Sequence, residues 1–149
     1  MVYDEILGAG SYPPPQPATL TDGAQDFTVG PANNSGDTDN RTFTVTVPRK
    51  GNIVGFLATA TLKSTLNQQD YLLIRVKRNN NLISSVYLDD WVVDPLPVRS
   101  GVVFNETLGL LSGAEVLQGD VFTLGFQKQG TGTNEIILTA SISLVVQYT

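Results

Sequence analysis

The fold is decided by residues 41–63, which read RTFTVTVPRKGNIVGFLATATLK. In the first part, Phe43, Val45 and Val47 alternate with threonines. This period of two is typical of a strand with one buried face. Pro48 ends that strand, and the basic, glycine-containing segment after it is typical of a turn. A second alternating run follows the turn, so the stretch predicts two consecutive β-strands.

The second strand, residues 53–63, carries apolar side chains on both faces. The face that we expect to be buried consists of Val54, Phe56, Ala58, Ala60 and Leu62. The opposite face includes Ile53 and Leu57, where a solitary sandwich should be polar. The last predicted strand shows the same feature at Ile137 and Val145. Because burial of apolar surface is favourable by ~25 cal/mol per Å², we expect these four side chains to lie in an interface between subunits.

The same period of two continues along the rest of the chain. Further strands are predicted at residues 71–78, 82–88, 98–104, 121–127 and 136–148. Turn residues separate them, and glycines argue against a helix in the remaining segments. Many short strands with regular turn signals indicate an all-β chain that forms a single jelly-roll or β-sandwich domain.

The N-terminal 30 residues have a different composition. Residues 13–17 read PPPQP, and proline fixes φ and removes backbone donors, so this stretch favours an extended polyproline II conformation. Its apolar residues are too few for a core. We therefore expect an extended arm over residues 1–30 and a β-jelly-roll head over residues 31–149, with the arm contributing little to the stability of the head.

The composition excludes several kinds of chemistry. The chain of 149 residues contains neither cysteine nor histidine. Disulfides, zinc–thiolate sites and the commonest general base and metal ligand are therefore absent. Glu106 and Glu115 are acids, but nothing in the sequence places two carboxylates across a cleft. We expect no catalytic residues, no metal site and no cofactor, and we predict that the chain is not an enzyme.

The charges are unevenly placed. Residues 1–40 hold six of the 14 acidic residues and none of the nine basic ones. An acidic chain is poorly suited to binding phosphate backbones. The basic residues Arg49, Lys50, Arg75, Lys77 and Arg78 could form a nucleic-acid patch or a solvated sheet face, and we favour the solvated sheet face. No apolar run is long enough to span a bilayer. We expect a basic protein surface as partner, and neither nucleic acid nor membrane.

One predicted loop holds an aromatic side chain among acids. Trp91 lies between the pair Asp89 and Asp90 and the single Asp94. Three interpretations stay open, namely a calcium loop, a glycan contact in which Trp91 is the stacking platform, and a solvated loop with a partly buried indole. The acids lack the regular spacing and the glycine of a calcium loop. Residues 37–40, which read DTDN, contain only the first fragment of that pattern.

Two segments resemble a known family. Residues 117–124, LQGDVFTL, resemble the leucine- and Gly-Asp-containing passage near the end of the tumour-necrosis-factor and complement-type globular heads. Residues 43–56 resemble the strand, Pro/Gly turn and following strand of the same heads. The resemblance covers residues 41–149 and implies a jelly roll that assembles as a trimer. The calcium and receptor-binding residues of that family have no matching positions in this sequence.

A short chain with a long N-terminal arm and such a head also resembles bacteriophage capsid decoration (cement) proteins. That resemblance implies a virion structural protein on the capsid surface, made in the host cytoplasm, whose partners are its own copies and the major capsid protein. The arm residues that we expect to contact the capsid are Tyr3, Asp4, Glu5, Ile6, Leu7, Tyr12, Pro13, Pro14 and Pro15. The alternative is a receptor- or carbohydrate-binding head, such as a phage adhesin or tail protein.

Overall fold

A computed structural model describes residues 16–64, 66, 69–89, 101–107 and 113–149, of which residues 89 and 101–107 are described by their backbone alone. The described residues form nine strands. They are β1 (Ala18–Val29), β2 (Arg41–Thr46), β3 (Gly51–Leu62), β4 (Asp70–Arg78), β5 (Asn81–Asp89), β6 (Gly101–Thr107), β7 (Glu115–Val116), β8 (Val121–Gly130) and β9 (Ile136–Tyr148). No helix occurs in this part of the chain, and hence none that is long and apolar enough to cross a membrane.

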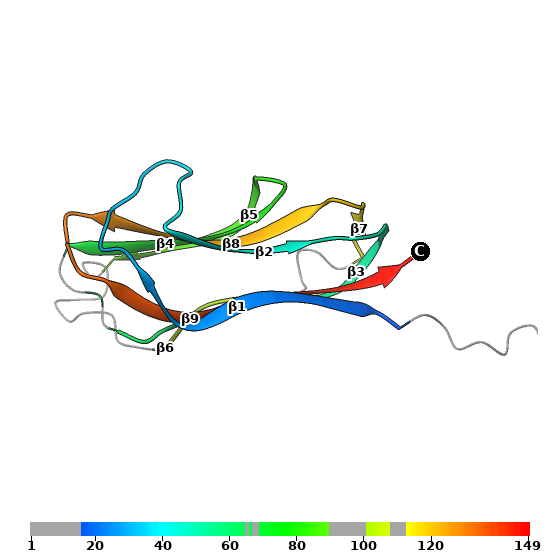
Figure 1. Cartoon of the computed structure of the whole chain (residues 1–149), viewed down its shortest axis with the longest axis horizontal. Coiled ribbons are helices and arrows are strands. Elements are labelled where there is room, and N and C mark those ends of the chain that lie inside the picture. Colours follow the sequence, from blue (N-terminus) through cyan, green and yellow to red (C-terminus); the bar gives the residue numbers. More distant parts are fainter. Residues whose placement is uncertain (1–15, 65, 67–68, 90–100, 108–112) are drawn as a thin grey trace, which may run out of the picture.

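The strands form two antiparallel sheets that face each other (Figure 1). Sheet A has the order β1-β9-β3-β6, with β7 paired to one end of β3, and sheet B has the order β2-β8-β4-β5. Leaving β7 aside, the first strand pairs with the last, the second with the penultimate, and so on inward to the β4–β5 hairpin. This nested pairing, folded into two layers, is the topology of a jelly roll. The predicted all-β jelly-roll sandwich is confirmed.

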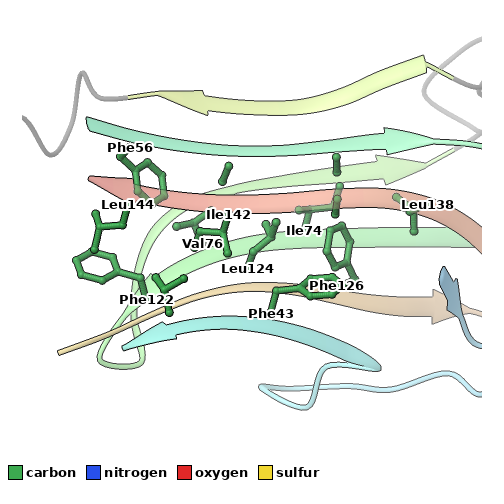
Figure 2. Packing of buried hydrophobic residues seen from close by; sticks show 14 of the residues in the cluster. Phe43, Phe56, Ile74, Val76, Phe122, Leu124, Phe126, Leu138, Ile142 and Leu144 are labelled. Carbon is green, nitrogen blue, oxygen red and sulfur yellow. The ribbon is translucent and has the colours of Figure 1, made fainter. Parts of the chain in front are cut away.

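The core lies between the two sheets and consists of alternate residues of the long strands (Figure 2). Phe43, Phe122, Leu124 and Phe126 of sheet B point toward residues such as Ile142 of sheet A. At one end Phe126 and Phe43 pack edge-on against a third ring, from β1, with centroid separations of 5.0–6.0 Å. Such T-shaped contacts add to the stabilisation from burial. The two alternating strands predicted at the start of the head thus supply opposite layers of one core.

A β-bulge in β3 corrects one part of the prediction. The pairing of β3 with β9 shifts between Ile53 and Gly55, so Val54 is an extra residue. The bulge turns both Ile53 and Phe56 toward the core, and Val54 toward solvent. Ile53 is 1% exposed. Its expected place on the outer face, and with it in a subunit interface, is therefore wrong, because a strict period of two does not survive an inserted residue.

The expected boundary between arm and head is also wrong at residue 30. Residues 18–29 form β1, which pairs with β9 along its length, and its Phe27 and Val29 are buried in the core. The N-terminal edge strand thus belongs to the head. The arm residues named above, from Tyr3 to Pro15, lie outside the described residues, as does Trp91.

Candidate functional site

The outer face of sheet A is the surface most suited to a function. It is formed by the side chains of β1, β9 and β3 that alternate with the core residues. Hydroxyls dominate it, at Thr21, Thr59, Thr61, Thr139, Ser141 and Ser143. Within β3 and β9, which the structure describes in full, the outward-facing residues include none with a charge. The part of the face formed by β3 and β9 is therefore uncharged and rich in small side chains.

A bulge in β1 hollows this face. Gln25 and Asp26 interrupt the pairing with β9, and Asp26 has a φ of 50°. The Asp26 N–H donates to the Thr139 hydroxyl at 3.0 Å, which holds the bulge against β9. Next to it, an open groove of about 580 Å³ is lined by hydroxyls of all three strands together with Asp22 and Gln25. The Asp22 carboxylate also accepts the Thr44 N–H at 2.9 Å, so it ties the edges of the two sheets together.

Three of the four expected interface residues do lie on this face, but not as one cluster. Leu57 is 40% exposed and pairs with Ser143, close to the partly exposed Val145, which lies opposite Gly55. Leu57 and Val145 therefore share one half of the sheet. Ile137 is exposed at the other end of β9, where its N–H donates to a serine hydroxyl in the turn after β3.

The basic residues do not form one patch. On the outer face of sheet B, Arg75 forms ion pairs with Asp39 at 2.6 Å and Asp37 at 3.4 Å, and Lys77 lies 3.7 Å from Asp37. These aspartates belong to the loop of residues 31–40, which arches over that face (Figure 1). The remaining basic residues of the sequence cluster lie near the other end of the sandwich, where they contact Tyr148, Glu115 and Asp120. The two halves of the cluster are thus separated and locally neutralised.

The acids of the DTDN segment are used structurally. Asp39 contacts Arg75, and the buried Gln127 side chain donates to the carbonyls of Gly36 and Thr38 at 3.1 and 2.6 Å. Among the described residues there is no group of three acidic side chains suited to hold a metal. Glu115 pairs with a lysine at 3.5 Å. The side chains of Asp89 and Glu106, and residues 90–100 with Asp90, Trp91 and Asp94, lie outside the description.

The glycine–aspartate motif that carried the family resemblance forms a corner of the sandwich. Gly119 has a φ of 91° in a turn closed by the Asp120 N–H donating to the Leu117 carbonyl at 3.0 Å. The Asp120 carboxylate accepts the Leu117 N–H at 2.9 Å and the Arg78 guanidinium at 2.8 Å. The Leu117 N–H, with added help from Asn79 and Arg78, lowers the pKa of Asp120 below its ordinary value of 3.8. The motif is therefore a structural clamp between β4 and β8.

This clamp predicts a pH-dependent loss of stability in Asp120→Asn. A carboxyl whose pKa is lowered by folding stabilises the fold above its unfolded pKa and loses that contribution as pH falls through the folded pKa. We expect the variant to be less stable than the wild type by about 1–2 kcal/mol near neutral pH. The difference should shrink once the pH falls below about 3.8. Urea unfolding of both proteins across this range measures it, and a difference that does not change with pH would contradict the assignment.

A buried ion pair lies at the opposite end of β8, and the sequence analysis did not identify it. Lys128 is 0% exposed and Asp70 1% exposed, with Nζ and Oδ1 3.3 Å apart. Lys128 also donates to the Asn33 side-chain oxygen at 2.9 Å and to the Gly132 carbonyl at 2.6 Å. The sequence contained one signal for the burial of Lys128, namely the alternation of β8. In this strand, position 128 continues the series of buried residues 122, 124 and 126.

Comparison of the sequence with known proteins identified no relative. No protein-family model matches the chain, and no curated protein is similar to it.

Proposed function

We propose that this chain is a structural subunit of a larger assembly, namely a phage capsid decoration protein that self-associates as a trimer and attaches to the major capsid protein through its N-terminal residues. The observation that carries the proposal is the uncharged outer face that β3 and β9 form in the middle of sheet A. Interface centres are depleted in charged residues, whereas solvated sheet faces carry them. Sheet B provides the contrast within the same molecule, because its outer face carries Arg75 and Lys77.

The apolar half of that face favours contact between copies of the chain. Leu57, Val145 and the bulged Val54 lie on neighbouring strands, and both Leu57 and Val54 are exposed. Covering them with a neighbouring copy of the chain removes apolar area from water without burying a charge. The surrounding threonine and serine hydroxyls can donate and accept, so they tolerate burial when paired across an interface.

The position of the N-terminal strand supports attachment through the residues before it. Ala18 pairs with Val146, close to the C-terminus, so the described chain begins at the same end of the sandwich where it finishes (Figure 1). The start of β1, which follows the N-terminal residues in the chain, thus lies at one end of the sandwich. The acidic and apolar side chains of residues 1–15, including Tyr3, Asp4 and Glu5, suit a surface with basic residues and shallow pockets.

One observation favours the alternative of a carbohydrate-binding head. The groove beside the β1 bulge offers hydroxyls, the Asp22 carboxylate and the Gln25 amide, which are groups that hydrogen-bond sugars. None of the described residues that line it is aromatic, so these residues provide no stacking platform for a sugar ring. We therefore place this function second.

The proposal is tested by capsid binding of three proteins. The full chain should sediment as an oligomer at micromolar concentration and bind saturably to phage capsids that lack it, at repeated positions visible by electron microscopy. Deletion of residues 1–15 should leave the oligomer intact but weaken capsid binding by roughly tenfold or more, because the avidity of several arms is lost. Leu57→Arg should sediment as a monomer, because it places a charge in the interface.

Thr42→Arg is the matched control, since Thr42 is exposed on sheet B and the same charge there should not change the sedimentation. A wild-type protein that is a clean monomer would contradict the trimer. Capsid binding that is unaffected by the deletion would contradict attachment through the arm. Binding restricted to tails or to glycans would favour the adhesin.

A further inference from the structure

The buried ion pair described above is part of a cluster of three side chains that carry reactive groups. The Lys128 amine, the Asn33 carboxamide and the Asp70 carboxylate come from β8, the 31–40 loop and β4, respectively. The amine nitrogen lies 2.9 Å from the Asn33 oxygen and 3.3 Å from Asp70 Oδ1. The amine nitrogen of Lys128 is therefore in contact with both a primary amide and a carboxylate.

Two glycines lie directly against this cluster of side chains. A Cβ added at Gly30 would lie 2.5 Å from Lys128 Cδ, and one at Gly132 would lie 1.8 Å from Asp70 Oδ1. The backbone thus packs directly against the lysine stem and the carboxylate, and it leaves both side chains without exposure to solvent. Asn33 covers the amine from an exposed loop. The amine and the carboxylate are shielded from solvent, whereas Asn33 is exposed, so a small product released from it has a short path to water.

The carboxylate has an unused acceptor. Asp70 Oδ1 is buried and accepts no hydrogen bond, although the Lys128 nitrogen is its near neighbour. Buried unpaired polar atoms are rare in native proteins and call for an explanation. Transfer of a proton from the ammonium to this oxygen would remove two buried charges at once and leave a neutral amine, the form in which lysine is a nucleophile.

We propose that Lys128 and Asn33 become joined by an intramolecular amide bond, with Asp70 as the catalytic proton carrier. Asp70 takes a proton from the Lys128 ammonium, and the free amine attacks Cγ of Asn33. Asp70 then passes the proton to Nδ2, the Cγ–Nδ2 bond breaks, and nitrogen leaves as ammonia, which takes up the remaining proton as ammonium. The Nζ–Cγ bond replaces the Cγ–Nδ2 bond, Asp70 returns to the carboxylate, and no oxidant or other reactant is needed.

The cross-link would change the connectivity of the jelly roll. It ties the loop between β1 and β2 to the centre of sheet B, where β8 pairs with β4. A force applied to the N-terminal strand would then reach β8 through a covalent bond rather than through side-chain contacts alone. Such a bond suits a subunit under mechanical load, but its existence does not depend on the function proposed above.

The test is the mass of the folded full-length protein after purification and denaturation. The intact chain should be lighter by one ammonia than its sequence requires. Trypsin cuts after basic residues, so Asn33 belongs to the peptide of residues 1–41. A lysine in amide linkage is not cut, so Lys128 should appear in a branched peptide that joins residues 1–41 to residues 100–149.

Variants separate this bond from cyclisation of an asparagine, which also releases ammonia. Asn33→Ala and Lys128→Met should have the full mass of their sequences, and Asp70→Asn should lose ammonia much more slowly than the wild type. Asn34→Ala is the matched control and should still be cross-linked. A wild-type protein of full mass, an ammonia loss that persists in Lys128→Met, or a wild-type digest without the branched peptide would each overturn the proposal. The wild-type digest tests for the cross-link even if a variant fails to fold.

Discussion

Deletion of residues 1–29 should abolish cooperative folding of the head. This deletion removes β1, so β9 loses its pairing partner along one edge and the core loses Phe27 and Val29. Truncation of a single buried phenylalanine typically costs about 3–5 kcal/mol. The loss of both side chains and of a strand therefore approaches the entire stability of a small domain, which is about 5–15 kcal/mol. Thermal and urea unfolding, followed by circular dichroism, measure the effect.

Two further variants test whether the loss of stability is caused by the removal of β1. Deletion of residues 1–15 preserves every described contact and should leave the unfolding midpoint of the head almost unchanged. The substitution Phe27→Ala should remain folded with a loss of about 3–5 kcal/mol, because the ring packs 5.0 Å from Phe43 and 5.2 Å from Phe126 between centroids. If the protein without residues 1–29 unfolded at the same temperature as the full chain, the assignment of β1 to the core would fail.

In an Asn33→Ala background, where the amide bond proposed above cannot form, Lys128→Met should destabilise the protein by about 3–5 kcal/mol, because it leaves the Asp70 carboxylate buried without a counter-charge. The nearest remaining polar contact of Asp70 is the Asn134 amide, at 3.4 Å from Oδ2. Methionine nearly fills the volume of the lysine stem, so the loss reports on charge rather than on a cavity. Urea unfolding at neutral pH provides the measurement.

The double variant Lys128→Met, Asp70→Leu is the decisive comparison. It removes both charges and should recover much of the stability lost in the single variant. Both variants are compared in the same Asn33→Ala background, so that the ion pair is measured alone. A double variant as unstable as Lys128→Met would show that the buried charge is not the cause.

The sequence was sufficient to predict the layers of the fold because most strands keep a strict alternation. The strands predicted at residues 41–47, 53–63, 71–78, 82–88, 121–127 and 136–148 are confirmed to within a few residues, and the one predicted at residues 98–104 is found at 101–107. In β8 and β9 every second residue is buried over most of the strand. Where this alternation holds, the buried face can be predicted residue by residue.

The errors arise where a bulge breaks the alternation. In β1 the inward positions are even-numbered up to Ala24 and odd-numbered from Phe27, because Gln25 and Asp26 lie opposite a single residue of β9. Neither half is long enough to indicate a strand, and the preceding prolines suggested an extended arm. In β3 the extra Val54 moved Ile53 from the predicted outer face into the core.

The candidate surfaces were less predictable than the fold. Leu57 and Val145 were predicted to be outward-facing and are, because their strands alternate regularly beyond the bulge. The separation of the basic residues and the meeting of Lys128 with Asp70 and Asn33 depend on contacts between residues far apart in the chain. Local sequence patterns contain no information about such pairs, so these could only come from the three-dimensional structure.

The nested pairing of the strands has a consequence for synthesis. The first strand, β1, has its partner in the last, β9, and the bond from Asp26 to Thr139 joins residues 113 positions apart. On the ribosome, β1 emerges long before β9, so the backbone N–H and C=O groups of β1 lack their native hydrogen-bond partners during this time. Because contacts of such long range form slowly, the nascent chain spends its whole elongation time with an unpaired edge. Sheet B, whose inner pair β4–β5 is a hairpin, can begin to form first, and sheet A can close only when translation has passed residue 148.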